Sequence, residues 1–246
     1  MKYFVLTLMS AAAFALPMAA RAEMTPEQKK EVEALVHQYV LEHGELLIES
    51  VNKYQAKQEE ESNAKASVKA KELLASLKTE KNMSIAGNPD GDITVVEFFD
   101  FNCGYCKKAF EEIQSLLKDD KNVKIVFYDM PILGPDSLES SKWALAAKRQ
   151  NKYFEYHTAL MQHQGGKDES TYKKIGEDLK LDMDKLIKDK ASTEVEAEIK
   201  THIGKAQELG IQGTPGFLIE DKVFRGYIPY EVIQNTIKEL RAAKKQ

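Results

Sequence analysis

Residues 93–106 read ITVVEFFDFNCGYC, and this stretch decides the fold. The segment from Ile93 to Phe101 is rich in β-branched and aromatic residues, which predicts a buried central strand. Asn102 is a residue type that caps helices, so we expect a helix to begin at the cysteines. The sequence therefore predicts an α/β fold in which Cys103 lies at the junction of this strand and this helix.

The predicted helix gives its two cysteines different environments. Cys106 shares one helical face with Phe110, Ile113 and Leu117, so we expect it to point inward. Free backbone N–H groups and the positive end of the helix dipole favour a thiolate at Cys103. We therefore expect Cys103 to be the nucleophile of a thiol–disulfide reaction and Cys106 to be the resolving thiol.

Three uses of a lone Cys-x-x-Cys pair compete in an exported chain: a structural bridge, a metal pair and a redox couple. A bridge across two residues closes so small a loop that the entropic model gives only about 2 kcal/mol. A structural zinc needs further ligands, and the chain has no second cysteine pair. We favour the redox couple and expect neither a metal nor a cofactor. The histidines that show no ligand spacing beside the pair are His37, His43, His157, His163 and His202.

Glu97 lies on the predicted central strand, six residues before Cys103. An acid in a buried strand is costly unless it is paired or carries protons. We interpret Glu97 as a proton carrier for Cys106. The alternative is that strand alternation points its side chain to solvent.

The first residues have the pattern of an export signal. Lys2 precedes an apolar run over residues 3–16, and residues 20–22 read Ala-Arg-Ala, the small-x-small pattern of a cleavage site. We expect residues 1–22 to be a signal peptide that directs the protein to the periplasm, with Glu23 as the mature start. Cleavage removes two cations and changes the formal charge from −4 to −6, which argues against a nucleic-acid partner.

Residues 23–82 are expected to form a helical extension and a connector. Residues 25–28, Thr-Pro-Glu-Gln, have the pattern of a helix start, and an apolar stripe with helical spacing follows. Residues 55–71 are dominated by polar residues and alanine, so we expect an exposed helical connector. The stripe either folds back on its own domain or pairs with other copies through residues 25–55. The polar connector favours the second arrangement, a dimer or a trimer. The stripe comprises Val32, Leu35, Val36, Tyr39, Val40, Leu47, Val51 and Tyr54.

Residues 83–246 are expected to form the catalytic domain, which begins near a dense turn signal at residues 87–91. Residues 137–209 have a helical pattern that predicts an inserted helical subdomain, with Gly210 as its stop signal. The other predicted elements are strands at residues 123–128, 216–220 and 223–227 and a final helix from Tyr230 to about Lys244.

Two motifs together resemble a known family. Residues 98–106, followed much later by Gly213-Thr214-Pro215 across a helical block, resemble the DsbA-type branch of the thioredoxin superfamily. The resemblance extends from about Met83 to the C-terminus and implies a thioredoxin fold with an inserted helical subdomain and, here, an N-terminal helical extension. In that family the Thr–Pro bond is cis and lies against the cysteines, which implies substrate binding by Thr214 and Pro215. Taken alone, this dipeptide would be an ordinary turn before a strand. Glu97 matches the buried acid of the family.

Departures from the best-known DsbA proteins bear on the direction of the reaction. Gly104 and Tyr105 stand where those proteins have Pro-His, and together with Thr214 they resemble the disulfide isomerase DsbC. The extension resembles those of oligomeric DsbA-like isomerases of the suppressor-of-copper-sensitivity type and of dimeric Legionella-type homologues. The resemblance implies a thiol–disulfide oxidoreductase, a protein disulfide isomerase, that acts on unfolded or misoxidised exported proteins. It also implies a membrane redox partner, either a DsbD-like reductase or a DsbB-like oxidase.

Two other functions compete with isomerisation. One is a DsbA-like dithiol oxidase without isomerase activity. The other is an exported helical scaffold or binding module, which has no need of an intact Cys103 and Cys106 or of Thr214-Pro215. Copper binding by the thiol pair is neither required nor excluded by the sequence.

Overall fold

The computed structural model describes residues 24–80 and 82–244. The predicted signal peptide, residues 1–22, and the predicted mature start at Glu23 lie outside the described residues. The chain divides into two compact units, residues 1–56 and 57–246, and each is described by itself. No helix in the described ranges is long and apolar enough to cross a membrane.

The described part of the first unit is almost entirely helical. Helix α1 (Pro26–Glu42) begins with the predicted capping box, in which the N–H of Gln28 donates to the Thr25 hydroxyl at 3.3 Å and the N–H of Thr25 donates to the Gln28 side chain at 2.9 Å. Helix α2 (Gly44–Leu77) starts in this unit. Within the described structure no residue of α1 is buried. The exposed large apolar residues of this unit include Val32, Leu35, Val36, Tyr39, Leu41, Leu46, Leu47, Ile48, Val51 and Tyr54.

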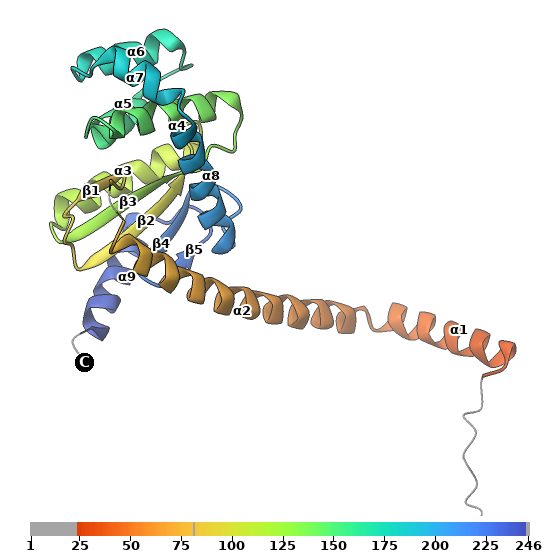
Figure 1. The fold of residues 1–246 in the computed structure, drawn as a ribbon. Helices are drawn as coiled ribbons and strands as arrows, with labels where there is room; N and C mark the ends of the chain where they lie inside the picture. Colours follow the sequence, from red (N-terminus) through yellow and green to blue (C-terminus); the bar gives the residue numbers. More distant parts are fainter. Residues whose placement is uncertain (1–23, 81, 245–246) are drawn as a thin grey trace, which may run out of the picture. The chain divides into compact units, whose positions relative to one another are not determined.

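The second unit is built on a mixed sheet with the strand order β1-β3-β2-β4-β5 (Figure 1). Strands β2 and β3 run parallel, and the other neighbouring pairs are antiparallel. The predicted central strand is confirmed, since β2 lies in the middle of the sheet. The short strand β1 was not among the predicted strands. The strands are β1 (Ile85–Gly87), β2 (Ile93–Phe99), β3 (Val123–Asp129), β4 (Gly216–Ile219) and β5 (Lys222–Phe224).

Helices cover both faces of the sheet. Helices α3 (Gly104–Asp119) and α9 (Tyr230–Ala243) pack on the face that carries Val95 and Phe99. Helix α8 (Thr193–Glu208) and the last turns of α2 pack on the face that carries Val96 and Phe98. Successive residues of a strand point to opposite faces, so Glu97 lies on the α3 face.

The last turns of α2 differ from the predicted connector. Residues 55–71 are helical, as predicted, and most of them are exposed, but Ala66 and Ala70 are buried, and so are Leu73 and Leu77 farther along α2. The prediction that the whole segment is exposed is therefore wrong at its C-terminal end. Alanine is often fully buried, yet two alanines one turn apart among polar residues do not form a recognisable apolar stripe.

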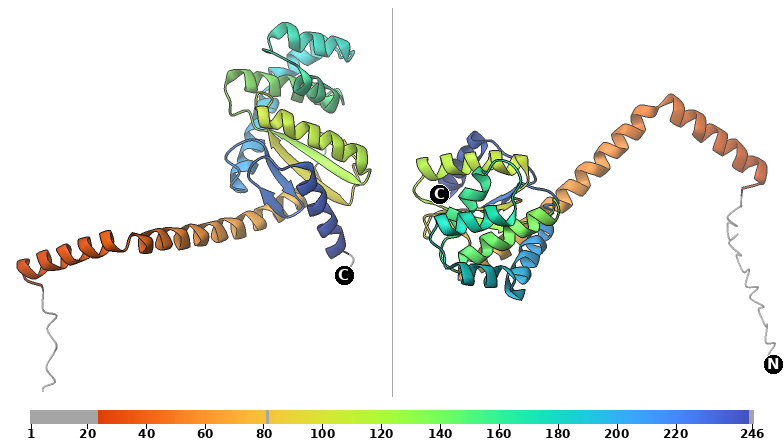
Figure 2. Two further views of the ribbon diagram at one scale, coloured as in Figure 1. Left: turned by 180° about the vertical axis from the view of Figure 1, so that it is seen from behind. Right: turned by 90° about the horizontal axis from the view of Figure 1, so that it is seen from above.

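Between β3 and β4 the chain forms the predicted helical insertion, of which α4 to α7 gather together at one side of the sheet while α8 runs along the face that carries Val96 and Phe98 (Figures 1 and 2). Its single tryptophan, Trp143, is fully buried and stacks on Tyr172 with 5.6 Å between ring centroids, while Nζ of Lys190 lies 4.7 Å from its ring. Gly210 follows α8 with φ +69°, which confirms the predicted stop signal. The other helices of the insertion are α4 (Pro135–Lys148), α5 (Tyr153–Gln162), α6 (Glu169–Asp178) and α7 (Met183–Lys190).

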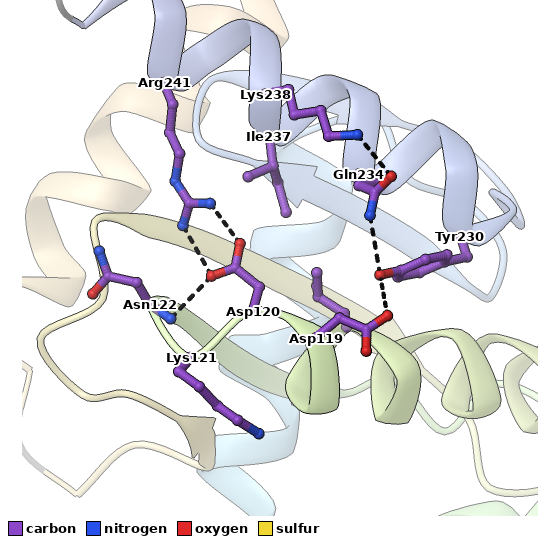
Figure 3. Close-up of a pocket in the computed structure, with 10 residues that line it drawn as sticks. Asp119, Asp120, Lys121, Asn122, Tyr230, Gln234, Ile237, Lys238 and Arg241 are labelled. Atoms are coloured by element: carbon purple, nitrogen blue, oxygen red, sulfur yellow. Dashed lines mark hydrogen bonds and ion pairs between the residues drawn. The ribbon is translucent and has the colours of Figure 1, made fainter.

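A surface pocket of about 330 Å³ lies at the C-terminal end of α3 (Figure 3). Arg241 of α9 donates to both oxygens of Asp120 and to both oxygens of Asp92. Tyr230, also on α9, donates to Asp119 at 2.7 Å. These groups satisfy one another and lie at the opposite end of α3 from the cysteines. We therefore assign them the role of anchoring α9.

Candidate active site

The two cysteines lie at the start of α3, directly after the end of β2. Cys103 itself is the N-cap residue, and α3 begins at Gly104. The prediction that Asn102 caps this helix is therefore wrong. The side chain of Asn102 is directed elsewhere: it donates to the Ser137 hydroxyl at 3.0 Å and accepts from Nζ of Lys167 at 2.7 Å.

Cys103 is held as a reactive thiol. Its side chain is 8% exposed, and its Sγ donates to the carbonyl oxygen of Thr214 at 3.3 Å. A hydrogen bond from Cys106 is the largest of the effects that lower the pKa of Cys103, to about 5. The Thr214 side chain and the backbone N–H groups of Tyr105 and Cys106 lower it further. The predicted placement of Cys103 at the start of the helix is confirmed.

Cys106 lies behind Cys103 and is fully buried. The N–H of Asp100 donates to its Sγ at 3.5 Å. Burial raises the pKa of Cys106 far above its ordinary value, and the hydrogen bond to Cys103 and the charge of Glu97 raise it further. The two thiols, both free in this structure, therefore differ strongly in their tendency to ionise.

Glu97 is fully buried, so the alternative that it points to solvent is wrong. In the sheet it pairs with Phe127 of β3 on one side and with Phe217 of β4 on the other. Among the described residues neither of its carboxyl oxygens has a hydrogen-bond partner. Burial raises the pKa of Glu97 to about 8, and the neighbouring charge of Cys103 contributes to this shift.

The dipeptide between the cysteines faces outward. Gly104 has open space where a side chain would begin, and Tyr105 is 65% exposed. The ring of Tyr105 lies 6.0 Å from that of Tyr227, and Nζ of Lys108 lies 4.6 Å from the Tyr227 ring. Together these rings form an aromatic surface beside the thiols.

Thr214 and Pro215 lie against the cysteines, and the bond between them is cis. A pocket of about 310 Å³ opens beside them, with Gly213 and Arg225 also in its lining. The structure thus brings together all the residues that the sequence predicted for the site, from β2, α3 and the segment before β4.

Asp100 is a residue of the site that the sequence did not reveal. Its fully buried carboxylate accepts from the N–H of Asn102 at 2.8 Å with one oxygen. With the other oxygen it accepts from the N–H groups of Ile132 and Leu133, at 2.8 and 3.0 Å. Asp100 thereby joins the active-site turn to the loop after β3. A charged residue between two phenylalanines directly before the Cys-x-x-Cys motif was the signal that could have found it.

Metal binding receives no support from the described part of the chain. In residues 24–80 and 82–244 no three His, Cys, Asp or Glu side chains come close enough to hold a metal ion.

Comparisons with known proteins agree with this geometry. The family model described as the DSBA-like thioredoxin domain matches residues 94–238, and the model described as the copper resistance protein ScsC N-terminal domain matches residues 28–61. Disulfide bond formation protein D of Bacillus subtilis is 28% identical over 185 residues, which cover 65% of this chain and 78% of that protein.

Two solved structures are similar to this one. A thioredoxin-like oxidoreductase from Silicibacter pomeroyi has 40% sequence identity and a TM-score of 0.64, and the match covers 68% of this chain and 96% of that one. A linker-deletion mutant of Proteus mirabilis ScsC has 22% identity and a TM-score of 0.67 over 91% of this chain and all of that one, a likeness of fold.

Some relatives are much longer than this chain. The chain spans 24% of the length of the Na⁺/H⁺ antiporter NhaA 1 of Salinispora arenicola, with 27% identity over 155 residues that cover 62% of this chain. The family model nevertheless matches more than half of the chain, over the segment that carries both cysteines, nearly all of β2 and all of β3, β4 and β5. The chain therefore belongs to the DSBA-like thioredoxin domain family.

Proposed function

We propose that this protein is a periplasmic thiol–disulfide oxidoreductase that isomerises disulfides in unfolded or misoxidised exported proteins. The observation that carries the proposal is the opposite shift of two neighbouring thiols: the pKa of Cys103 falls to about 5, whereas burial raises that of Cys106. A low thiol pKa supplies the attacking thiolate at neutral pH. A high pKa keeps the second thiol, Cys106, protonated at neutral pH, so that it does not take part in the first attack.

The reaction begins when the Cys103 thiolate attacks one sulfur of a substrate disulfide. A bond forms between Cys103 and that sulfur, the substrate disulfide breaks, and the other substrate sulfur leaves as a thiolate that takes a proton. If a different substrate thiolate then attacks the mixed disulfide, Cys103 is released and the substrate has a rearranged bridge. No net oxidation or reduction has occurred in that cycle.

Cys106 provides the other outcome. When its thiolate attacks Cys103, the Cys103–Cys106 disulfide forms, and the substrate leaves with both sulfurs reduced by the two electrons that the enzyme loses. Glu97 lies on the face of the sheet that α3 covers, its charge acts on Cys106 of α3, and it is assigned to accept the Cys106 proton. Formation of the mixed disulfide removes the charge of Cys103, one of the causes that raise the pKa of Glu97, and so favours the carboxylate that accepts the proton.

Three features support isomerisation. The exposed dipeptide Gly104-Tyr105 and Thr214 before the proline resemble those of DsbC, and the extension has the exposed apolar residues expected of an oligomerisation segment. We assign residues 25–55 to an interface between copies of this chain, because the ScsC N-terminal model matches residues 28–61 and no residue of α1 is buried among the described residues. Two or more sites in one assembly can hold a substrate while its bridges rearrange. A DsbD-like membrane reductase would keep Cys103 reduced.

A specific observation favours a second candidate, a dithiol oxidase recharged by a DsbB-like partner. A thiolate stabilised at Cys103 stabilises the reduced form of the enzyme and makes its disulfide a stronger oxidant. The similarity to disulfide bond formation protein D points the same way.

Two assays on the mature full-length chain test these functions. We expect recovery of scrambled ribonuclease activity that is lost in Cys103→Ser, and we expect Cys103 to be mostly reduced when it is trapped by alkylation in the native compartment. Oxidation of reduced ribonuclease without recovery of the scrambled form would favour the oxidase. Inactivity in both assays would leave the binding-module function.

A further inference from the structure

Arg225 joins segments that lie far apart in the sequence. It follows β5, and its guanidinium donates in three directions: Nε to the carbonyl oxygen of Gly210 at 3.1 Å, one terminal nitrogen to the carbonyl oxygen of Leu209 at 3.3 Å, and the other terminal nitrogen to Oδ1 of Asn63 at 2.7 Å. Asn63 lies on α2, and Leu209 and Gly210 follow α8. One side chain therefore connects both helices of the second sheet face to the end of β5.

Two of these contacts satisfy backbone groups at a helix end. The last carbonyl groups of a helix have no partner within the helix, and a guanidinium fork can bind several of them at once. Gly210 leaves room for this arrangement: a side-chain carbon at that position would lie 3.2 Å from the guanidinium nitrogens. The contact of Arg225 with the end of α8 is thus closely fitted.

The segment that Arg225 holds leads directly to the active site. Gly210 stands four residues before Thr214, and the carbonyl oxygen of Thr214 accepts from Sγ of Cys103 at 3.3 Å. The start of this segment is fixed a second time, because the N–H of Ile211 donates to the carbonyl of Ala206 at 2.9 Å. Residues 212–214 and Pro215 span the distance between this anchored start and β4, where Gly216 pairs with Phe98 of β2.

Arg225 also forms a wall shared by two pockets. The pocket beside Thr214 and Pro215 has a volume of about 310 Å³, and its neighbour, of about 410 Å³, is lined by Asn63 and Glu59 of α2. The first pocket lies beside Cys103, since its lining residue Thr214 accepts from the Cys103 thiol. Arg225 therefore borders both the segment that contacts the thiol and the surface next to it.

We propose that Arg225 is a positioning residue of the exchange reaction, which ties α2 and the end of α8 to the segment that places Thr214 against Cys103. The proposal rests on the proposed role of Cys103 as the nucleophile. The fork geometry carries the effect, and a lysine, with one nitrogen, cannot replace it.

The test is the pH dependence of iodoacetamide alkylation of Cys103 in the full mature chain with Cys106 changed to alanine in every protein compared. The hydrogen bond from the Thr214 side chain lowers the pKa of Cys103 and depends on where Thr214 is placed. In Arg225→Ala we expect the pKa of Cys103 to rise by roughly half a unit to one unit above that of the Cys106→Ala parent, so that alkylation slows about two- to fivefold at pH values at and below the parent's pKa and stays unchanged well above it. Arg225→Lys should show the same rise. Asn63→Ala should show a smaller rise in the same direction. Lys222→Ala, which removes an exposed cation of β5 that pairs with Glu239, is the matched control and should show none.

Each contrary result overturns a defined part of the proposal. An unshifted Arg225→Ala profile, with a melting curve that shows a folded protein, would remove the positioning role. A wild-type profile for Arg225→Lys would show that charge and not geometry matters. An unshifted Asn63→Ala profile would remove α2 from the connection. A Cys103 that resists alkylation in the parent protein would instead contradict the proposed function itself.

Discussion

The two units of this chain differ in whether their large apolar residues are buried or exposed. In residues 57–244 both faces of the sheet are covered, and the large side chains of β2 and β3 are almost completely buried. In residues 24–56 most of the large apolar side chains are exposed, Val40 is half-buried, and α1 buries none of its residues in the described structure. The second unit therefore has a core of its own, whereas the described part of the first has none and, under the proposed function, is covered by other copies of the chain. Chemistry and assembly should therefore be separable by substitution.

The largest expected effect is confined to the second unit. Cys103→Ser should lower thiol–disulfide exchange by about three orders of magnitude or more, because a serine hydroxyl is not ionised at neutral pH and cannot form the mixed disulfide. Turnover of a fluorescent disulfide substrate measures this loss. The mass of the assembly in light scattering should not change, and a change in mass would show that the site and the extension are coupled.

A second large effect comes from the buried acid of the second unit. The pKa of Glu97 is about 8 when folded, against an ordinary 4.5, so between these values the folded state binds more protons than the unfolded state. Stability from this group is therefore present at low pH and lost as pH rises toward 8. Between pH 5 and pH 8 the free energy of unfolding of the wild type should fall by roughly 3–4 kcal/mol through the titration of Glu97, and Glu97→Gln should not show this part of the fall.

Urea unfolding at pH 5 and pH 8 measures this difference. Burial also raises the pKa of Asp129, to about 7. Asp129 is present in both the wild type and the variant, so its titration does not account for a difference between them. Equal losses of stability in the wild type and the variant would show that Glu97 is not desolvated as the structure has it.

A smaller effect is expected from the first unit. The pair of substitutions Leu35→Glu and Val36→Glu places two charges on the exposed stripe and should reduce the assembly to single chains. Scrambled-ribonuclease recovery should fall about tenfold, since a charge that must be desolvated at an interface costs more than 1 kcal/mol. The rate at which the double variant reduces a small disulfide substrate, expressed per Cys103, should remain within about twofold of the wild-type rate.

Lys30→Glu is the matched control, because it changes the net charge by the same amount at an exposed polar position of α1. Size-exclusion chromatography with light scattering reports the mass. A double variant that keeps the mass of the wild type would show that the stripe is not the interface.

The smallest effect concerns the start of α1. Thr25→Ala removes the hydroxyl that accepts from Gln28 and should destabilise the helix by about 0.5–1 kcal/mol. When the protein is diluted, far-ultraviolet circular dichroism should show that Thr25→Ala dissociates at a modestly higher protein concentration than the wild type does. The pH profile of Cys103 alkylation should be identical to that of the wild type, and a shifted profile would mean that the two units are not independent.

Local patterns predicted much of the fold. The strand from residue 93, the helix after the cysteines, the helical insertion and the capping box at Thr25 each follow from neighbouring residues, whose preferences act over one or two turns. Asn102 shows where such reasoning fails. Its residue type suits a cap, but a lysine 65 residues away and a serine 35 residues away bind its side chain instead.

The parts of the site that could not be predicted depend on long-range partners. Asp100 binds N–H groups 32 and 33 residues farther along, and Arg225 contacts a residue 162 positions before it. The burial of Glu97 was the interpretation favoured from the sequence, and the helices that cover both faces of β2 exclude the solvent-facing alternative. Sequence spacing identifies residues that share an element, but it does not identify which elements pack together.

The packing of Trp143 has a spectroscopic consequence. It is the only tryptophan of the chain, and it lies between Tyr172 of α6 and Lys190 of α7, within the helical insertion. Intrinsic tryptophan emission therefore originates from the insertion and from neither the extension nor the strands. A denaturation curve followed by fluorescence reports the insertion, whereas one followed by circular dichroism reports every helix, of which α1 and α2 supply 51 of the 139 helical residues described. A difference between the two curves would separate the melting of the insertion from that of the helices outside it within a single sample.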